Sequence, residues 1–308
     1  MLIYTFKRLL RLLLLWLALI TLTFGMRLVI PGDPVETLFA QQPANSEVIA
    51  SVRHELGLDQ PLPIQYFNYI ANALQGDLGK SLITGRPVLS EISDRYFKTV
   101  LLAVSGLAIA LIYGIGSGVL AVWIKSRVLE KVLTALNLLL VSLPGFWLGL
   151  LLLDWFSIQL GWLPVLSEND LVQLILPALT LGLISGALLF RVIKAELLEA
   201  LNQDYIKTAQ AKGLTRQAIV IRHALKNALT PVVTLVELQF GALLGGAIII
   251  ENVFAWPGLG QLAVQAINQR DYPIIQGLVL LTATTYVVVN TGVDLLYHWL
   301  NPRVQKLA

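Results

Sequence analysis

Long apolar runs separated by short charged segments make up most of the chain. Five of these runs lie between Lys98 and Lys125, Lys131 and Asp154, Asp170 and Arg191, Lys226 and Glu251, and Asp271 and Asp294. A shorter run follows Arg11 and continues as apolar sequence to Ile30. A helix of about 20 apolar residues crosses the hydrocarbon core of a bilayer. The pattern therefore predicts six transmembrane helices, the last five at 99–124, 132–153, 171–190, 228–250 and 272–293.

Two segments between the predicted spans are too long to be simple connections. Residues 31–97 are polar and rich in Pro and Gly, with short amphipathic stretches such as 63–74. Residues 191–226 carry apolar residues at helical spacing, with Lys and Arg on the other face. The predicted organisation is a first helix with its flank at 1–30, a small lobe at 31–97, a core at 98–300 that includes the loop 191–226, and a tail at 301–308.

The distribution of basic residues predicts the orientation. With the N-terminus in the cytoplasm, 15 of the 22 Lys and Arg residues lie inside and 7 outside. The short outer segments support this, because 154–170 has no Lys or Arg and 251–271 has only Arg270. Cytoplasmic loops carry the excess of Lys and Arg in membrane proteins. We therefore expect a multi-pass protein with both termini in the cytoplasm.

Composition narrows the function classes. Of the 308 residues, 56% are apolar and 13% are charged, and none is Cys. Soluble domains carry about 25% charged residues, so this low charged fraction is typical of an integral membrane protein. Because the chain has no Cys, it has no disulfide, thiolate metal site or cysteine nucleophile. The three His residues are scattered, so the sequence predicts no metal centre and no catalytic triad. The net charge of +3 is divided between separate loops, which argues against a nucleic-acid-binding stripe.

Two small motifs invite a structural interpretation. Gly114 and Gly118 are four residues apart, as are Gly241 and Gly245, and this spacing makes a flat strip for a neighbouring helix. Gly79-Lys80-Ser81 matches the end of a phosphate-binding loop, but Leu74 stands where that motif needs its first Gly. We expect a turn of the lobe there, and no ATP site.

Glu237 is the one acid deep within a predicted span. An ionisable group at that depth is costly and faces the bundle interior or a wet cavity. One hypothesis is that Glu237, with Gln239 on the same helix, lines a translocation pathway and meets a cationic or amine-bearing solute. The alternative is a hydrogen-bonded acid that packs helices together. The sequence leaves both open.

The cytoplasmic stretch 204–215 carries the most specific local signal. Small side chains at Thr208, Ala209 and Ala211 flatten a short helix, and Gly213 permits a turn after it. Such a helix end suits docking into a groove of a soluble partner protein. The alternative is a helix that lies along the membrane surface with ordinary loop chemistry.

Further short motifs follow in a fixed order over nearly the whole chain: Thr23-Phe24, Pro31-Gly32-Asp33-Pro34, Leu56-Gly57-Leu58-Asp59-Gln60-Pro61, Gly76-Asp77-Leu78-Gly79-Lys80-Ser81, Asp204-Tyr205, Ala211-Lys212-Gly213-Leu214, Arg222-His223-Ala224-Leu225-Lys226-Asn227-Ala228, Ile250-Glu251, Phe254-Ala255-Trp256-Pro257-Gly258-Leu259-Gly260, Arg270-Asp271-Tyr272-Pro273 and Asn301-Pro302-Arg303. In this order they resemble the first of the two membrane subunits of bacterial ATP-binding cassette (ABC) importers for dipeptides, oligopeptides, glutathione and nickel.

The resemblance implies an all-α membrane protein of the type I ABC importer permease kind. It implies six transmembrane helices, a small extracytoplasmic lobe after the first, and a coupling helix that docks on the ATPase between the fourth and fifth. The docking residues would be Asp204, Tyr205, Lys207, Thr208, Ala209, Ala211, Lys212 and Gly213. The broad importer motif is Glu-Ala-Ala, then any three residues, then Gly. It is matched at Ala209 and Gly213, has a small replacement at Thr208 and departs at Lys207.

The resemblance also implies the partners and the location. These are a second homologous permease chain, two ATPase subunits that bind ATP and Mg, an extracytoplasmic solute-binding protein and the lipid of the bacterial inner membrane. The chain itself would bind no cofactor and would not be an enzyme. Its cargo would be di- or oligopeptides, or a related small solute such as glutathione or nickel, free or chelated, and the sequence does not decide among these.

Two other function classes compete with this interpretation. An ion-gradient-driven secondary transporter would show inverted repeats, broken helices and several intramembrane charges. The chain has no visible repeat and one such charge, Glu237. A structural membrane scaffold would tolerate a bulky residue at Gly213, whereas an importer subunit would lose coupling.

Overall fold

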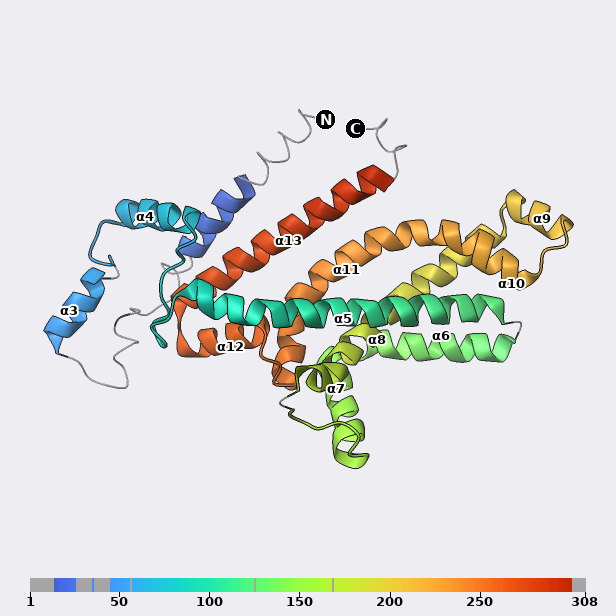
Figure 1. Cartoon of the computed structure of the whole chain (residues 1–308), viewed down its shortest axis with the longest axis horizontal. Helices are drawn as coiled ribbons and strands as arrows, with labels where there is room; N and C mark the ends of the chain where they lie inside the picture. Colours follow the sequence, from blue (N-terminus) through green and yellow to red (C-terminus); the bar gives the residue numbers. More distant parts are fainter. Residues whose placement is uncertain are drawn as a thin grey trace. The chain divides into compact units, whose positions relative to one another are not determined.

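The computed structural model describes residues 14–25, 35, 45–55, 57–124, 126–167 and 169–300, and regular structure within them is helical, without a strand. The helices are Leu14–Gly25, α3 (Ser46–Glu55), α4 (Leu62–Leu74), α5 (Val88–Trp123), α6 (Arg127–Ser142), α7 (Gly145–Leu153), η1 (Asp154–Gln159), α8 (Asp170–Leu201), α9 (Asp204–Ala211), α10 (Arg216–Ala218), η2 (Ile219–Ala224), α11 (Leu225–Val253), α12 (Leu259–Gln269) and α13 (Tyr272–Leu300) (Figure 1). Both η elements are π-helical turns.

Contacts divide the chain into two compact units. The central unit is Lys98–Gly260, and the terminal unit joins the described residues up to Phe97 with those from Gln261 onward. The predicted domain boundaries at 30, 97 and 300 are drawn on membrane topology, so they remain predictions.

Among the described residues, three helices are long and apolar enough to cross a membrane: α5, α8 and the part of α13 from Tyr272 to Val289. They overlap the predicted spans 99–124, 171–190 and 272–293. The count rises to five if each of two bent helix pairs is one span. The helix Leu14–Gly25 is apolar but shorter than a span. The multi-span helical class is therefore established, and the number six remains a prediction.

The predicted span 132–153 is bent in the structure. α6 and the helix from Gly145 to Gln159 meet at 107°. The cause is Pro144, which lacks an N–H and disfavours helical geometry in the residue before it. Leu143 is accordingly extended, with φ −78° and ψ 135°. A count of uncharged residues between charges cannot detect this bend.

Within the central unit, α8 packs against α5 through small residues. A Cβ added at Gly114 would lie 2.7 Å from the carbonyl oxygen of Gly186, and one at Gly118 would lie 2.6 Å from Cγ2 of Ile193. Contacts this close require glycine, so the predicted packing role of Gly114 and Gly118 is confirmed. Gly182 and Gly186, again four residues apart, form the facing strip on α8. The facing strip was not predicted.

Candidate functional site

The segment singled out by the sequence forms α9 and the turn after it. Ile206 and Ala209 are buried, whereas Asp204, Tyr205, Lys207, Thr208, Gln210, Ala211 and Lys212 are exposed. The helix therefore has one apolar face turned into the protein and a larger face of mostly small or polar side chains turned outward.

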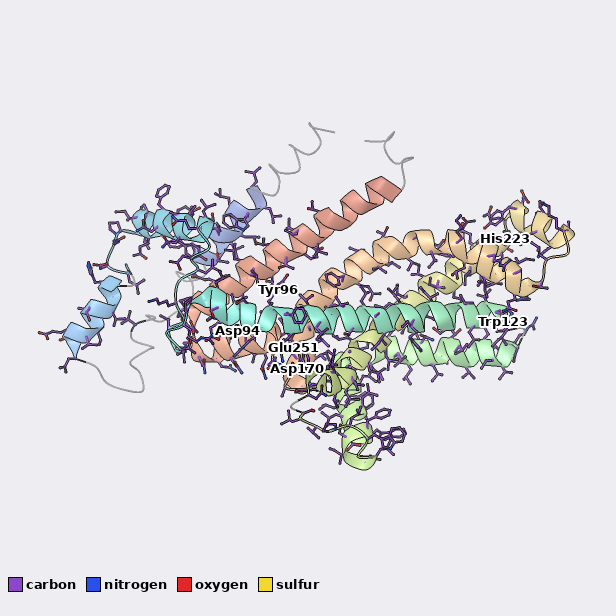
Figure 2. All side chains as sticks on the ribbon, viewed as in Figure 1. Asp94, Tyr96, Trp123, Asp170, His223 and Glu251 are labelled. Carbon is purple, nitrogen blue, oxygen red and sulfur yellow. The ribbon has the colours of Figure 1, made fainter. Side chains whose placement is uncertain are left out.

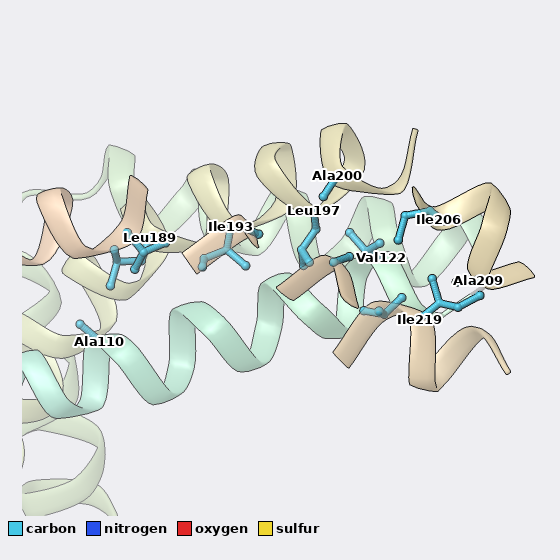
Figure 3. Packing of buried hydrophobic residues seen from close by; sticks show 13 residues of the cluster. Ala110, Val122, Leu189, Ile193, Leu197, Ala200, Ile206, Ala209 and Ile219 are labelled. Carbon is cyan, nitrogen blue, oxygen red and sulfur yellow. The ribbon is translucent and has the colours of Figure 1, made fainter. Parts of the chain in front are cut away.

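The inner face of α9 is held by an apolar cluster that joins several helices. Ile206 and Ala209 belong to one cluster with Val122 at the end of α5, Leu197 on α8 and Ile219 on η2 (Figure 3). Ile206 is 0% exposed, and burying such a side chain is worth about 1.5–3 kcal/mol. α9 is therefore packed against the ends of α5 and α8 and against η2, which leads into α11.

Hydrogen bonds reinforce this attachment. Asn227 Nδ2 on α11 donates to the Tyr205 hydroxyl at 2.8 Å. Arg216 Nη2 donates to the carbonyl oxygen of Val122 at 2.8 Å, which ties the segment after α9 to the end of α5. Lys207 and Asp204 pair at 2.8 Å on the exposed face, where an ion pair contributes little.

Gly213 ends the helix with a left-handed turn. Its φ is +77°, and its N–H donates to the carbonyl oxygen of Gln210 at 2.9 Å. Space around it is open, so a side chain there costs about 1–2 kcal/mol through the backbone conformation alone. The turn predicted at Gly213 is present.

Sequence reasoning missed a buried polar junction at the other end of α11. Glu251 is 0% exposed and accepts hydrogen bonds from the Thr99 hydroxyl on α5 and the Gly260 N–H, each at 2.6 Å. The Thr99 oxygen in turn accepts the Leu259 N–H at 2.7 Å. The carboxylate and the Thr99 hydroxyl therefore fasten the first two residues of α12 to α5 and α11.

Trp256 closes the same junction. Its indole is 0% exposed and its Nε1 donates to the carbonyl oxygen of Lys98 at 3.0 Å. The ammonium of Lys98 lies 5.6 Å from the Trp256 ring centroid and 2.5 Å from Asp170 at the start of α8. Figure 2 labels Asp170 and Glu251 at this junction. The start of α8 and the end of α11 thus meet α5 at Lys98 and Thr99 in one hydrogen-bonded corner.

The signal for this corner was present in the sequence. Gly258 and Gly260 are the residues that let the backbone wrap the carboxylate, since a Cβ at Gly258 would overlap Glu251 and one at Gly260 would overlap Ile248. An acid followed by a Trp-Pro-Gly run and a second Gly is thus a candidate for backbone wrapping. Charge counting treated Glu251 as a span boundary.

The predicted pathway residues are only partly described. The side chain of Glu237 lies outside the described residues. Gln239 is half-buried, and its Nε2 donates to the carbonyl oxygen of Ser185 on α8 at 3.1 Å. This contact joins α11 to α8, and a pathway role for either residue remains a prediction.

In the terminal unit, Gly79-Lys80-Ser81 forms a turn, as expected. Lys80 makes an isolated bridge with Pro87. The Ser81 hydroxyl donates to Asp271 at 2.5 Å, and Leu82 N–H donates to the same carboxylate at 3.2 Å. Asp271 is 3% exposed, so this acid holds the turn beside the start of α13.

No group of three potential metal ligands occurs in the part of the chain that the structure describes. The several membrane-length apolar helices among these residues indicate an integral membrane protein. The family described as binding-protein-dependent transport system inner membrane component matches residues 114–306, and its N-terminal counterpart matches residues 1–103. The chain belongs to this family.

Individual relatives agree. The glutathione transport system permease protein GsiC of Escherichia coli (strain K12) and that of Salmonella typhi are each 42% identical over 305 residues, covering 99% of this chain and 99% of theirs. The methionine ABC transporter MetNI, in an inward-facing conformation, shares the fold with a TM-score of 0.57 and 19% identity, covering 68% of this chain and 95% of that chain. An amino acid ABC transporter gives a TM-score of 0.53 and 16% identity, covering 70% and 94%.

The chain is thus an inner-membrane permease subunit of an ABC importer of the peptide family, and the ATPase and the solute-binding protein are partner chains. The assignment decides against an ion-gradient-driven transporter and a scaffold.

Proposed function

We propose that α9 is the coupling helix, and that its outer face docks in a groove of the ATPase. The observation that carries this is the division of α9 into a buried face, Ile206 and Ala209, and an exposed face of small side chains that includes Thr208 and Ala211. Because Ile206 and Ala209 anchor the helix in the apolar cluster, the small exposed side chains stay available to a partner. Gly213 lets the chain turn away directly after it.

The mechanism follows from what α9 touches. ATP bound by the partner subunits closes them, and their grooves move α9. The apolar cluster passes the movement to α5, α8 and α11, while the junction at Glu251 keeps these three helices together at a second place. Rigid-body rocking of packed elements is a common form of switching. The glycine strip between α5 and α8 keeps this pair moving as one body.

The proposed assembly extends this picture. Six spans place both termini and α9 in the cytoplasm and residues 31–97 outside, as a lobe that meets the solute-binding protein. A second homologous permease chain completes the pathway, and two ATPase subunits dock, one at each coupling helix. This chain binds no cofactor, and ATP and Mg are held by the ATPases.

We propose a peptide-type cargo, with glutathione first, because relatives 42% identical over 99% of the chain carry that name. Every peptide with a free N-terminus carries an ammonium group, which suits the pathway role suggested for Glu237 and Gln239. Nickel remains a second cargo to be tested, since the sequence resembles both branches.

The test is ATP-dependent uptake into vesicles that contain the assembled importer and its binding protein. Labelled glutathione and a dipeptide should accumulate without any ion gradient, and nickel should not. Accumulation of nickel alone would overturn the peptide cargo.

The Glu237→Gln variant belongs in the same assay. It should slow uptake of a cationic dipeptide severalfold more than uptake of a neutral one, because the carboxylate of the neutral dipeptide offsets its ammonium, whereas the cationic dipeptide has a net positive charge that Glu237 attracts. Equal effects on both would assign Glu237 to helix packing.

A further inference from the structure

A shallow groove of about 520 Å³ lies between α6 and α8 in the central unit. It is lined by Arg127, Glu130, Lys131, Thr134, Ala135, Leu138 and Lys194. Six of these belong to α6, and Lys194 is the contribution of α8. The importer function uses none of these side chains.

The charges of the groove favour an anion. Arg127 and Lys131 are exposed, and neither pairs with an acid among the described residues. Lys194 bonds Glu130 at 2.9 Å and Thr134 at 3.0 Å. The ion pair with Glu130 therefore offsets the charge of Lys194 within the groove. The charge left over is that of Arg127 and Lys131, and the start of α6 adds its positive dipole end.

The stripe changes character along α6. Arg127, Lys131, Thr134 and Leu138 follow one another at spacings of four, three and four, so they share one face of the helix. At 1.5 Å per residue the stripe is about 16 Å long, close to half of the ~30 Å hydrocarbon core. Its far end is apolar, and Leu138 is 59% exposed.

An exposed Trp also lies just before the first residue of the stripe. Trp123, 42% exposed, ends α5 just before α6 starts (Figure 2), and Trp is enriched at membrane–water interfaces. Basic pockets between transmembrane helices are binding places for anionic lipid head groups. A ligand with an anionic head and an apolar tail matches the order of residues from Arg127 to Leu138.

We propose that this groove binds one anionic phospholipid, its phosphate at Arg127 and Lys131 and an acyl chain along Leu138. The lipid fills the groove between α6 and α8 and thereby supports the unit that carries α9. The proposed ligand is a lipid and not a free phosphate ion, because a phosphate ion has no apolar part to contact the apolar half of the stripe.

The experiment uses the assembled importer, stripped of lipid in a neutral detergent and titrated with dioleoyl phosphatidylglycerol, followed by native mass spectrometry. Phosphatidylglycerol should bind, while dioleoyl phosphatidylcholine should bind much more weakly. The double variant Arg127→Gln, Lys131→Gln should bind phosphatidylglycerol about thirtyfold more weakly, since each surface charge contributes about 1 kcal/mol.

The matched control removes two exposed basic residues outside the groove, Arg222→Gln and Lys226→Gln, and should bind as the wild type does. Melting curves without lipid check that all three proteins are folded. Equal binding of the two lipids, unchanged binding by the groove variant, or competition by inorganic phosphate alone would each overturn the proposal. So would a groove covered by a partner subunit, which would appear as no phosphatidylglycerol bound at all.

Discussion

Replacing Ala211 by Trp should abolish ATP-dependent uptake and leave the melting temperature of the subunit unchanged. Ala211 is exposed on the outer face of α9, so a large side chain there blocks docking without entering the core. Forcing extra volume into a fitted surface costs about 1–3 kcal/mol, which is roughly a fivefold to 150-fold loss of ATPase binding. Uptake into vesicles and a pull-down of the ATPase measure the two effects.

Ala209 provides the matched control on the same helix. It is 5% exposed and belongs to the apolar cluster, so Ala209→Trp overpacks that cluster at a cost of about 1–3 kcal/mol. This variant should lose stability as well as uptake. If Ala211→Trp also melted early, or transported normally, the outer face would have no docking role.

Replacing Glu251 by Ala should destabilise the subunit more than any exposed substitution. The change leaves the Thr99 hydroxyl and the Gly260 N–H without their acceptor. A buried unsatisfied donor costs about 1–3 kcal/mol, so the two together cost roughly 2–6 kcal/mol. Thermal melting in detergent, followed by size-exclusion chromatography, gives the measurement.

Two further variants give an intermediate and a control value for the loss of stability. Glu251→Gln keeps one acceptor oxygen in place and should fall between Ala and the wild type. Glu199→Ala removes an exposed acid from α8 and should stay within about 0.5 kcal/mol of the wild type. Equal melting of Glu251→Ala and Glu199→Ala would mean that the junction does not hold the helices.

The sequence was sufficient to predict those structural features that depend on residues close together in the chain. A long apolar helix must avoid charge, so the spans within α5, α8 and α13 could be placed from charges alone. The glycine strip on α5, Gly114 and Gly118, could be predicted because helix geometry puts residues four apart on one face. The turn at Gly213 could be predicted because only glycine enters that conformation readily.

The rest depends on contacts between distant segments. The glycines after Glu251 indicate that backbone wraps its carboxylate, but nothing local to either residue indicates that Thr99, far away in the chain, donates to it. Pro144 was visible, but its consequence is a 107° bend and not a simple interruption. The attachment of α9 through Ile206 needs the ends of α5, α8 and η2 assembled around it, which no periodicity specifies.

Cross-linking from position 211 tests the central claim most directly. The chain contains no Cys, so an Ala211→Cys variant offers one thiol, and a short thiol-to-lysine reagent then joins it to its nearest neighbour in the assembled importer. The account predicts a product between this subunit and the ATPase, formed from the cytoplasmic side, and none from an Ala71→Cys variant on α4. No product from position 211, or labelling of that thiol by an impermeant reagent from outside the cell, would contradict it.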